Sequence, residues 1–184
     1  MTAVDQSTVT EPVWVDLTNL SAERVPERVA VWLEDQGSLT KALIDACAGQ
    51  FRVEVQHQGW ADASSGERHL LEMSAGQKAM LREVDLLCDE QPWVFARTVI
   101  PADSLSGRVG MLAHLGDKPL GAVLFSDPDT RRRKVEIARL TPGHSLYVTA
   151  CEHLAEKPAE VWGRRTLFEY AGKLILVNEI FLPR

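Results

Sequence analysis

Three segments of this chain have the pattern of β-strands, and each places one charge on an otherwise apolar face: Arg82 in residues 79–88, Arg97 in residues 93–100 and Glu179 in residues 173–182. Successive side chains of a strand point to opposite faces, so each charge is flanked by apolar residues two positions away. Burying an unpaired charge costs several kcal/mol, which is a large part of the net stability of a domain. The pattern therefore predicts a ligand site built on a sheet.

Two other interpretations fit the same pattern. Arg82 and Glu179 could neutralise each other as a buried ion pair with a purely architectural role. One face of each strand could instead be solvated, and the charges would then need no partner. None of these interpretations identifies a ligand.

The composition narrows the class of protein. A chain of 184 residues, of which 45% are hydrophobic, is sufficient for one core and one domain. Its net charge of −6 argues against a general nucleic-acid binder. No unbroken apolar stretch reaches the roughly 18 residues of a membrane helix, and residues 1–16 lack the basic and apolar regions of a secretory signal. We therefore expect a soluble protein without stable membrane insertion that stays in the cytoplasm.

The periodicity of the apolar residues predicts an α+β fold with an antiparallel sheet. Residues 1–18 read as a flexible tail, followed by a single domain over residues 19–184. Two helix-turn-helix corners are expected, one around Gly37 with Ser38 capping its second helix, and one within residues 109–126. Strands are expected from Phe51 onward and at about residues 79–88, 93–100, 132–140, 164–170 and 173–182, with a loop at about residues 61–69. Short connections between successive strands favour hairpins over parallel crossovers.

Common catalytic motifs are absent: the chain has no Gly-rich phosphate loop, no GxSxG and no HExxH. Cys151 and His153 lie close together but lack the further ligands that a metal needs, so no metal site is expected. Cys47, Cys88 and Cys151 are odd in number and widely spaced, which favours reduced, buried thiols. The basic run at residues 131–134 is expected to be a solvated strand end, with steering of an anionic substrate as the alternative.

Further short motifs accompany the charged segments in a fixed order: Ser38-Leu39-Thr40-Lys41, Leu81-Arg82-Glu83-Val84, Ala96-Arg97-Thr98-Val99-Ile100-Pro101, Leu105-Ser106-Gly107, Leu115-Gly116-Asp117-Lys118-Pro119-Leu120-Gly121, Val135-Glu136-Ile137-Ala138-Arg139, Trp162-Gly163-Arg164-Arg165 and Leu176-Val177-Asn178-Glu179-Ile180-Phe181-Leu182-Pro183. Over about residues 29–183 the chain thereby resembles the chorismate pyruvate-lyase family, also called 4-hydroxybenzoate synthase.

The resemblance implies a six-stranded antiparallel sheet with helix-turn-helix flaps over a buried ligand cavity. It implies conversion of chorismate to 4-hydroxybenzoate and pyruvate, the first committed step toward ubiquinone, without a cofactor. A pocket that holds a nearly planar aromatic acid should also hold the product, so product inhibition is expected. The odd number of cysteines and the acidic composition are compatible with a monomer.

The resemblance carries the ligand contacts onto Leu39, Arg82, Leu120 and Glu179. In this assignment Arg82 would bind the ring carboxylate, and Arg97 would bind the enolpyruvyl carboxylate or orient other groups. Glu179 would accept the C4 hydroxyl hydrogen bond, act as general base for the C4 proton, or only position the substrate during a concerted transfer of that hydrogen.

The rival hypothesis from another class is a non-catalytic domain that senses or binds 4-hydroxybenzoate. The effector domains of one family of bacterial transcription regulators resemble this fold, but they normally follow a winged-helix DNA-binding segment. Only about 25 residues precede the matching region, which is too short for such a segment. A third possibility is an α+β protein in which Arg82 and Glu179 are merely paired.

Overall fold

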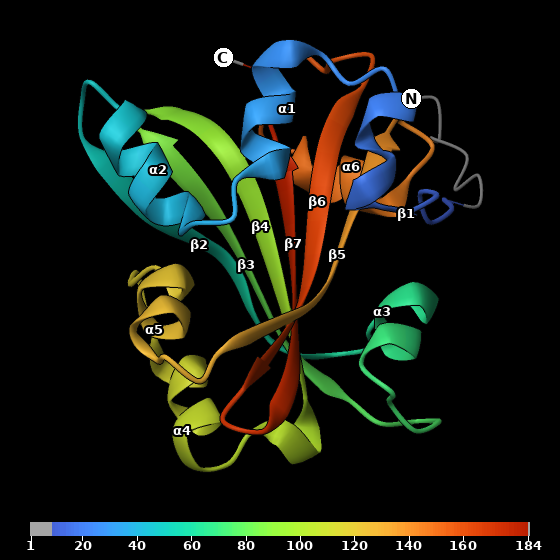
Figure 1. Cartoon of the computed structure of the whole chain (residues 1–184), viewed down its shortest axis with the longest axis vertical. Coiled ribbons are helices and arrows are strands. Elements are labelled where there is room, and N and C mark those ends of the chain that lie inside the picture. Colours follow the sequence, from blue (N-terminus) through green and yellow to red (C-terminus); the bar gives the residue numbers. More distant parts are fainter. Residues whose placement is uncertain (1–8, 184) are drawn as a thin grey trace, which may run out of the picture.

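The computed structural model describes residues 9–183 and consists of one antiparallel sheet with helices on both faces (Figure 1). The sheet has seven strands in the order β1-β5-β6-β7-β4-β3-β2. They are β1 (Val15–Asp16), β2 (Phe51–Ala61), β3 (Ala79–Cys88), β4 (Gln91–Pro101), β5 (Arg131–Leu140), β6 (Val161–Tyr170) and β7 (Lys173–Phe181). The α+β class and the antiparallel pairing agree with the sequence prediction. The expected number of six strands was wrong, because the two-residue β1 pairs with β5.

One face of the sheet is covered by the two predicted helical corners. The first corner contains α1 (Glu27–Glu34) and α2 (Leu39–Ala46). The second contains α4 (Gly107–Gly110), the 3₁₀ helix η3 (Met111–His114) and α5 (Leu120–Ser126). Apolar side chains of both corners pack on β3, β4, β6 and β7, so the space between helices and sheet is walled mainly by hydrophobic residues.

The opposite face is covered by α3 (Ser65–Leu70) and α6 (Ser145–Ala150). Helix α3 lies where the sequence analysis expected a loop. Its first turn has a capping box, in which the Ser64 side chain accepts from the Glu67 amide and the Glu67 carboxylate accepts from the Ser64 amide. The Ser-x-x-Glu signal for this helix was present in the sequence, but a loop rich in serine, glycine and charge was inferred instead.

Local sequence explains the other boundaries. Ser38 caps α2 by accepting a hydrogen bond from the Lys41 amide. The β6–β7 hairpin turns at Ala171 and Gly172, whose φ angles of 51° and 73° match the left-handed conformation of a tight hairpin turn. Within residues 9–183, none of the helices has the length and apolar character required to span a bilayer.

The flexible tail was expected to reach residue 18, but the chain is already part of the sheet at residues 15 and 16. Val15 and Asp16 pair with Ile137 and Glu136 of β5, and the 3₁₀ helix η1 (Leu17–Ala22) follows directly. Residues 1–8 of the expected tail lie outside the described residues. The domain therefore begins before residue 19, because the chain near residue 15 completes one edge of the sheet.

The expectation of three reduced cysteines was wrong for two of them. Cys47, at the end of α2, and Cys88, at the end of β3, form a disulfide across 41 residues of sequence. Sequence spacing gave no sign of this pair, since only the packing of the first corner on the sheet brings the two residues together. Cys151 is free and buried, as expected.

Candidate active site

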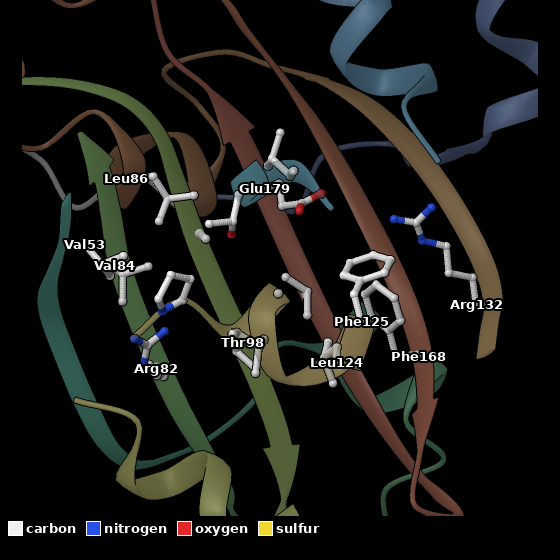
Figure 2. A pocket seen from close by; sticks show the side chains of 17 residues that line it. Val53, Arg82, Val84, Leu86, Thr98, Leu124, Phe125, Arg132, Phe168 and Glu179 are labelled. Carbon is white, nitrogen blue, oxygen red and sulfur yellow. The ribbon is translucent and has the colours of Figure 1, made fainter. Parts of the chain in front are cut away.

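A cavity lies between the sheet and the two helical corners (Figure 2). Its walls are mostly apolar, with three charged side chains among them, namely Arg82, Arg132 and Glu179. The apolar and small lining residues include Val53, Val84, Leu86, Ala96, Leu124, Phe125, Phe168 and Val177. Of the five residues that sequence reasoning singled out, Leu39, Arg82, Leu120 and Glu179 line this cavity, whereas Arg97 does not.

Arg82 points into the cavity from the middle of β3 and is only 4% exposed. Its Nη2 donates to the carbonyls of Gly116, at 2.9 Å, and Lys118, at 3.1 Å, in the turn before α5. Its Nε is buried and has no hydrogen-bond partner within residues 9–183. Burial lowers the pKa of this guanidinium. A buried cation with an unused donor is suited to bind an anion.

Glu179 is held by Arg164 and not by Arg82. The two residues are opposite each other on β7 and β6, and Arg164 Nε donates to Glu179 Oε2 at 2.7 Å. Arg164, which is 2% exposed, also donates to the carbonyls of Trp32, at 3.0 Å, and Asp35, at 2.7 Å, at the end of α1. A buried ion pair between Arg82 and Glu179, one of the alternatives considered from sequence, is therefore wrong. Arg164 was not predicted as a site residue.

Arg132 is the third charged group of the cavity, and sequence reasoning missed it. It lies in the basic run that was expected to be a solvated strand end. A β-bulge between Arg132 and Lys134 shifts the alternation of β5, so Arg132 lies opposite Phe168 and faces the cavity. Its neighbours Arg131 and Arg133 are exposed.

Leu39 and Leu120 are the first residues of α2 and α5, and both are buried. The first four amides of a helix lack partners within the helix, so these two helix starts present N–H groups at the cavity. The two corners meet here, because a Cβ added to Gly121 would lie 3.1 Å from Thr40 Oγ1. A larger residue at Gly121 would press the corners apart.

Comparison with known proteins identifies the family of this chain. The family model for chorismate lyase matches residues 9–184. This chain belongs to the chorismate lyase family. A protein named probable chorismate pyruvate-lyase from Nitrosospira multiformis is 37% identical over 86% of this chain and 88% of its own length. One with the same name from Methylococcus capsulatus is 41% identical over 83% of this chain and 93% of its own.

Solved structures of low sequence identity resemble this chain in fold alone. The effector domain of PhnF from Mycobacterium smegmatis aligns with a TM-score of 0.58 and 15% identity, over 80% of this chain and 89% of that one. The ligand-binding domain of a GntR-family regulator from Bordetella bronchiseptica aligns with a TM-score of 0.52 and 14% identity, over 73% and 85%. The chorismate lyase family member described here thus shares its architecture with ligand-binding domains of transcription regulators.

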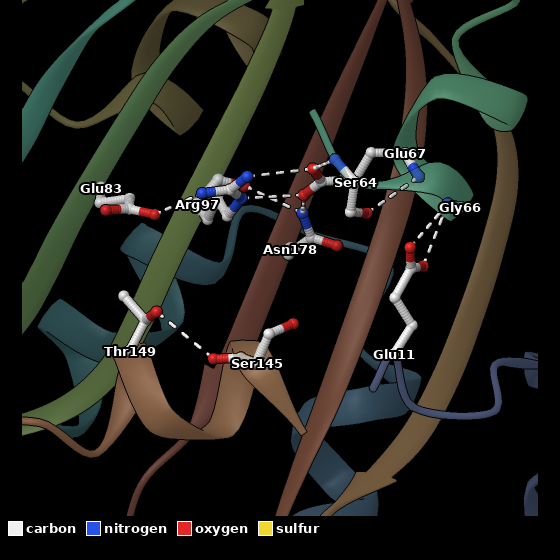
Figure 3. Close-up of polar contacts among 9 residues, drawn as sticks. All are labelled: Glu11, Ser64, Gly66, Glu67, Glu83, Arg97, Ser145, Thr149 and Asn178. Atoms are coloured by element: carbon white, nitrogen blue, oxygen red, sulfur yellow. Dashed lines mark hydrogen bonds and ion pairs between the residues drawn. The ribbon is translucent and has the colours of Figure 1, made fainter. Parts of the chain in front are cut away.

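Arg97 lies on the opposite face of the sheet from the cavity (Figure 3). Its Nε donates to Glu67 at 2.9 Å and its Nη1 to Glu83 at 2.5 Å, and Asn178 also donates to Glu67. Burial alone would raise the pKa of Glu67, but the hydrogen bond and charge of Arg97 outweigh it and lower that pKa. The register pairs Arg97 with Glu83 and Arg82 with Thr98, so the two arginines of this lyase-family chain point to opposite faces. Arg97 therefore does not line the cavity that holds Arg82 and Glu179.

Proposed function

We propose that this protein converts chorismate to 4-hydroxybenzoate and pyruvate. The observation that carries the proposal is the cavity itself, in which Arg82 keeps a buried, unused donor and Glu179 is held as a fixed carboxylate by Arg164. Membership of the chorismate lyase family supports the same reaction. The product would supply ubiquinone synthesis.

The ring carboxylate is assigned to Arg82. Its Nε is free to donate, and charge-assisted hydrogen bonds to a carboxylate are about twice as strong as neutral ones. The amides at the starts of α2 and α5, at Leu39 and Leu120, would complete the carboxylate site. The apolar walls then enclose the ring.

Glu179 is assigned to the C4 end of the ring. The reaction breaks the bond between C3 and the ether oxygen and removes the hydrogen from C4, so the ring becomes aromatic and the enolpyruvyl group leaves as pyruvate. Arg164 holds one oxygen of the carboxylate, which leaves the other to accept the C4 hydroxyl hydrogen bond or to take the C4 proton. If the C4 hydrogen is instead transferred within the substrate to the enolpyruvyl methylene, Glu179 only positions the ring. The elimination is redox-neutral, so this assignment needs no redox cofactor.

Slow product release follows from the same assignment. The ring carboxylate and the C4 hydroxyl persist in 4-hydroxybenzoate, so the groups that bind them bind substrate and product alike. The cavity encloses about 50 Å³, whereas a protein cavity that accepts benzene measures roughly 150 Å³. A ring can therefore enter or leave only if the covering helices shift outward, as the expected flaps would.

A sensor that binds 4-hydroxybenzoate without turnover is the second candidate, favoured by the shared architecture with regulator domains. Incubation of the purified protein with chorismate in the presence of EDTA separates the two. We expect 4-hydroxybenzoate and pyruvate in equal amounts, measured by chromatography and absorbance, with an initial rate that falls when 4-hydroxybenzoate is added. Tight binding of 4-hydroxybenzoate without pyruvate formation would reject the lyase and support the sensor.

A further inference from the structure

Arg132 is anchored at the cavity wall but keeps one donor unused. Its Nη1 donates to the Gln36 carbonyl and its Nη2 to the Gly37 carbonyl at 2.8 Å, both in the turn of the first corner. Its guanidinium lies over the rings of Phe125, at 5.1 Å, and Phe168, at 5.6 Å. Its Nε is buried and finds no hydrogen-bond acceptor in the described part of the chain. Arg82 likewise has a buried Nε without a hydrogen-bond partner in the described residues.

The charges around Arg132 leave room for one more anion. Glu179 and Asp35 attract Arg132, while Arg164 repels it, so these groups are close enough to interact. Arg164 is already committed to Glu179 and to backbone carbonyls at the end of α1. The charged side chains that line the cavity itself are two cations, Arg82 and Arg132, and one carboxylate, Glu179, so the lining carries one surplus positive charge. An anionic ligand group here would offset the surplus positive charge.

The positions of the charged side chains along the cavity indicate which group of the substrate would meet the surplus positive charge. Arg82 and Arg132 lie at opposite ends of the cavity, and Glu179 lies between them (Figure 2). On the proposed function, Arg82 holds the ring carboxylate and Glu179 addresses C4. The enolpyruvyl group is attached at C3, next to C4, so its carboxylate extends from the Glu179 end of the ring and away from Arg82.

We infer that Arg132, through its free Nε, binds the enolpyruvyl carboxylate of the substrate. The inference rests on the proposed function and deepens it, because this carboxylate is the group that chorismate has and 4-hydroxybenzoate lacks. Arg132 thus distinguishes substrate from product, while Arg82 binds both. It takes the role that sequence reasoning gave to Arg97.

The test compares two affinities in the same variants. Arg132→Gln removes the charge, and we expect the KM for chorismate to rise at least about tenfold while the inhibition constant of 4-hydroxybenzoate changes less than about threefold. Arg132→Lys keeps a charge without the guanidinium and should fall between the wild type and Arg132→Gln in KM. The matched control is Arg131→Gln, an exposed arginine of the same run, which should leave both constants unchanged.

The outcomes separate the inference from its premise. An equal loss of chorismate and 4-hydroxybenzoate affinity in both Arg132 variants would mean that Arg132 only supports the first corner, and unchanged constants would mean that it does not meet the substrate. Either result, with an active wild type, overturns the inference and leaves the proposed function standing. A wild type that does not turn over chorismate overturns both. If Arg132→Gln does not fold, Arg132→Lys decides by the same ratio of constants.

Discussion

At the scale of single residues, the buried arginines differ in whether their donors are used. Arg97 meets two carboxylates, and Arg164 meets Glu179 and the backbone, so both are satisfied by the protein itself. Arg82 and Arg132 each keep a buried Nε without a partner in the described residues. An unused buried donor has a desolvation cost that a ligand can offset. It is this property, and not burial alone, that marks the site.

Glu179→Gln tests the carboxylate at the reacting end of the cavity. Glutamine can still accept the hydrogen bond from Arg164, whereas alanine would leave that buried cation unpaired and destabilise the fold by about 3–5 kcal/mol. We expect kcat for chorismate to fall at least about 100-fold, the range of general acid–base catalysis, and the melting temperature to fall no more than in Glu136→Gln, because both variants remove the counter-charge of a buried arginine. The matched control is Glu136→Gln, since Glu136 accepts a hydrogen bond of 2.6 Å from the buried Arg165 but lies outside the cavity. Wild-type kcat in Glu179→Gln would refute a catalytic role.

At the scale of elements, α2 is attached at both ends to the parts that form the site. Its first residue, Leu39, lines the cavity, and Cys47 at its other end is bonded to Cys88 of β3, the strand that also carries Arg82. On the proposed function the covering helices shift to admit the ring, and the disulfide would then restrain one of the elements that move. The second corner has no such covalent link among the described residues, where Cys47–Cys88 is the one disulfide.

Reduction of this disulfide should lower the free energy of unfolding. A cross-link that closes a loop of this length stabilises a domain by about 2–4 kcal/mol, mainly by restricting the unfolded chain. We expect urea unfolding of the wild type to show this loss when dithiothreitol is added. Cys47→Ser should match the reduced wild type and show no response to dithiothreitol, while Cys151→Ser should keep the response. Identical unfolding curves with and without reductant would show that the disulfide contributes nothing.

At the scale of the whole molecule, the sheet separates two kinds of buried charge. The cavity face holds Arg82 and Arg132, whose Nε atoms have no hydrogen-bond partner among the described residues. The opposite face holds Arg97 with its carboxylate partners Glu67 and Glu83, and also the buried Asp85. Burial raises the pKa of Asp85 to about 6, an effect that the hydrogen bond from Gln56 and the nearby charge of His153 only partly oppose. A carboxyl group with a raised pKa is more easily ionised in the unfolded chain than in the folded protein.

Asp85→Asn should therefore change how stability depends on pH. Between pH 4 and 6 the folded protein keeps a proton on Asp85 that the unfolded chain has lost, so this residue makes the wild type less stable as the pH rises. Asparagine has no such titration and can still accept from Gln56. We expect the free energy of unfolding of Asp85→Asn, relative to wild type, to increase from pH 4 to pH 7 by at most about 3 kcal/mol. The measurement is urea unfolding of both proteins at each pH. A difference in unfolding free energy between Asp85→Asn and wild type that stays constant from pH 4 to pH 7 would contradict the raised pKa of Asp85.

The amino-acid sequence by itself determined the local elements, because caps, turns and periodicity act over a few residues. Ser38 starting α2 and the turn at Ala171 and Gly172 are examples. Alternation in β3 also determined that Arg82 shares a face with Val84 and Leu86, and the family motifs pointed to Arg82 and Glu179, all of which line the cavity.

Only the tertiary structure decided which charges meet. Strand pairing placed Arg97 opposite Glu83 and turned it away from the cavity, and a bulge in β5 turned Arg132 toward it. Packing of α2 on the sheet joined Cys47 to Cys88. The physical reason is the same in each case: alternation gives relative faces along one strand, whereas the partner of a side chain depends on register, bulges and packing between segments far apart in the chain.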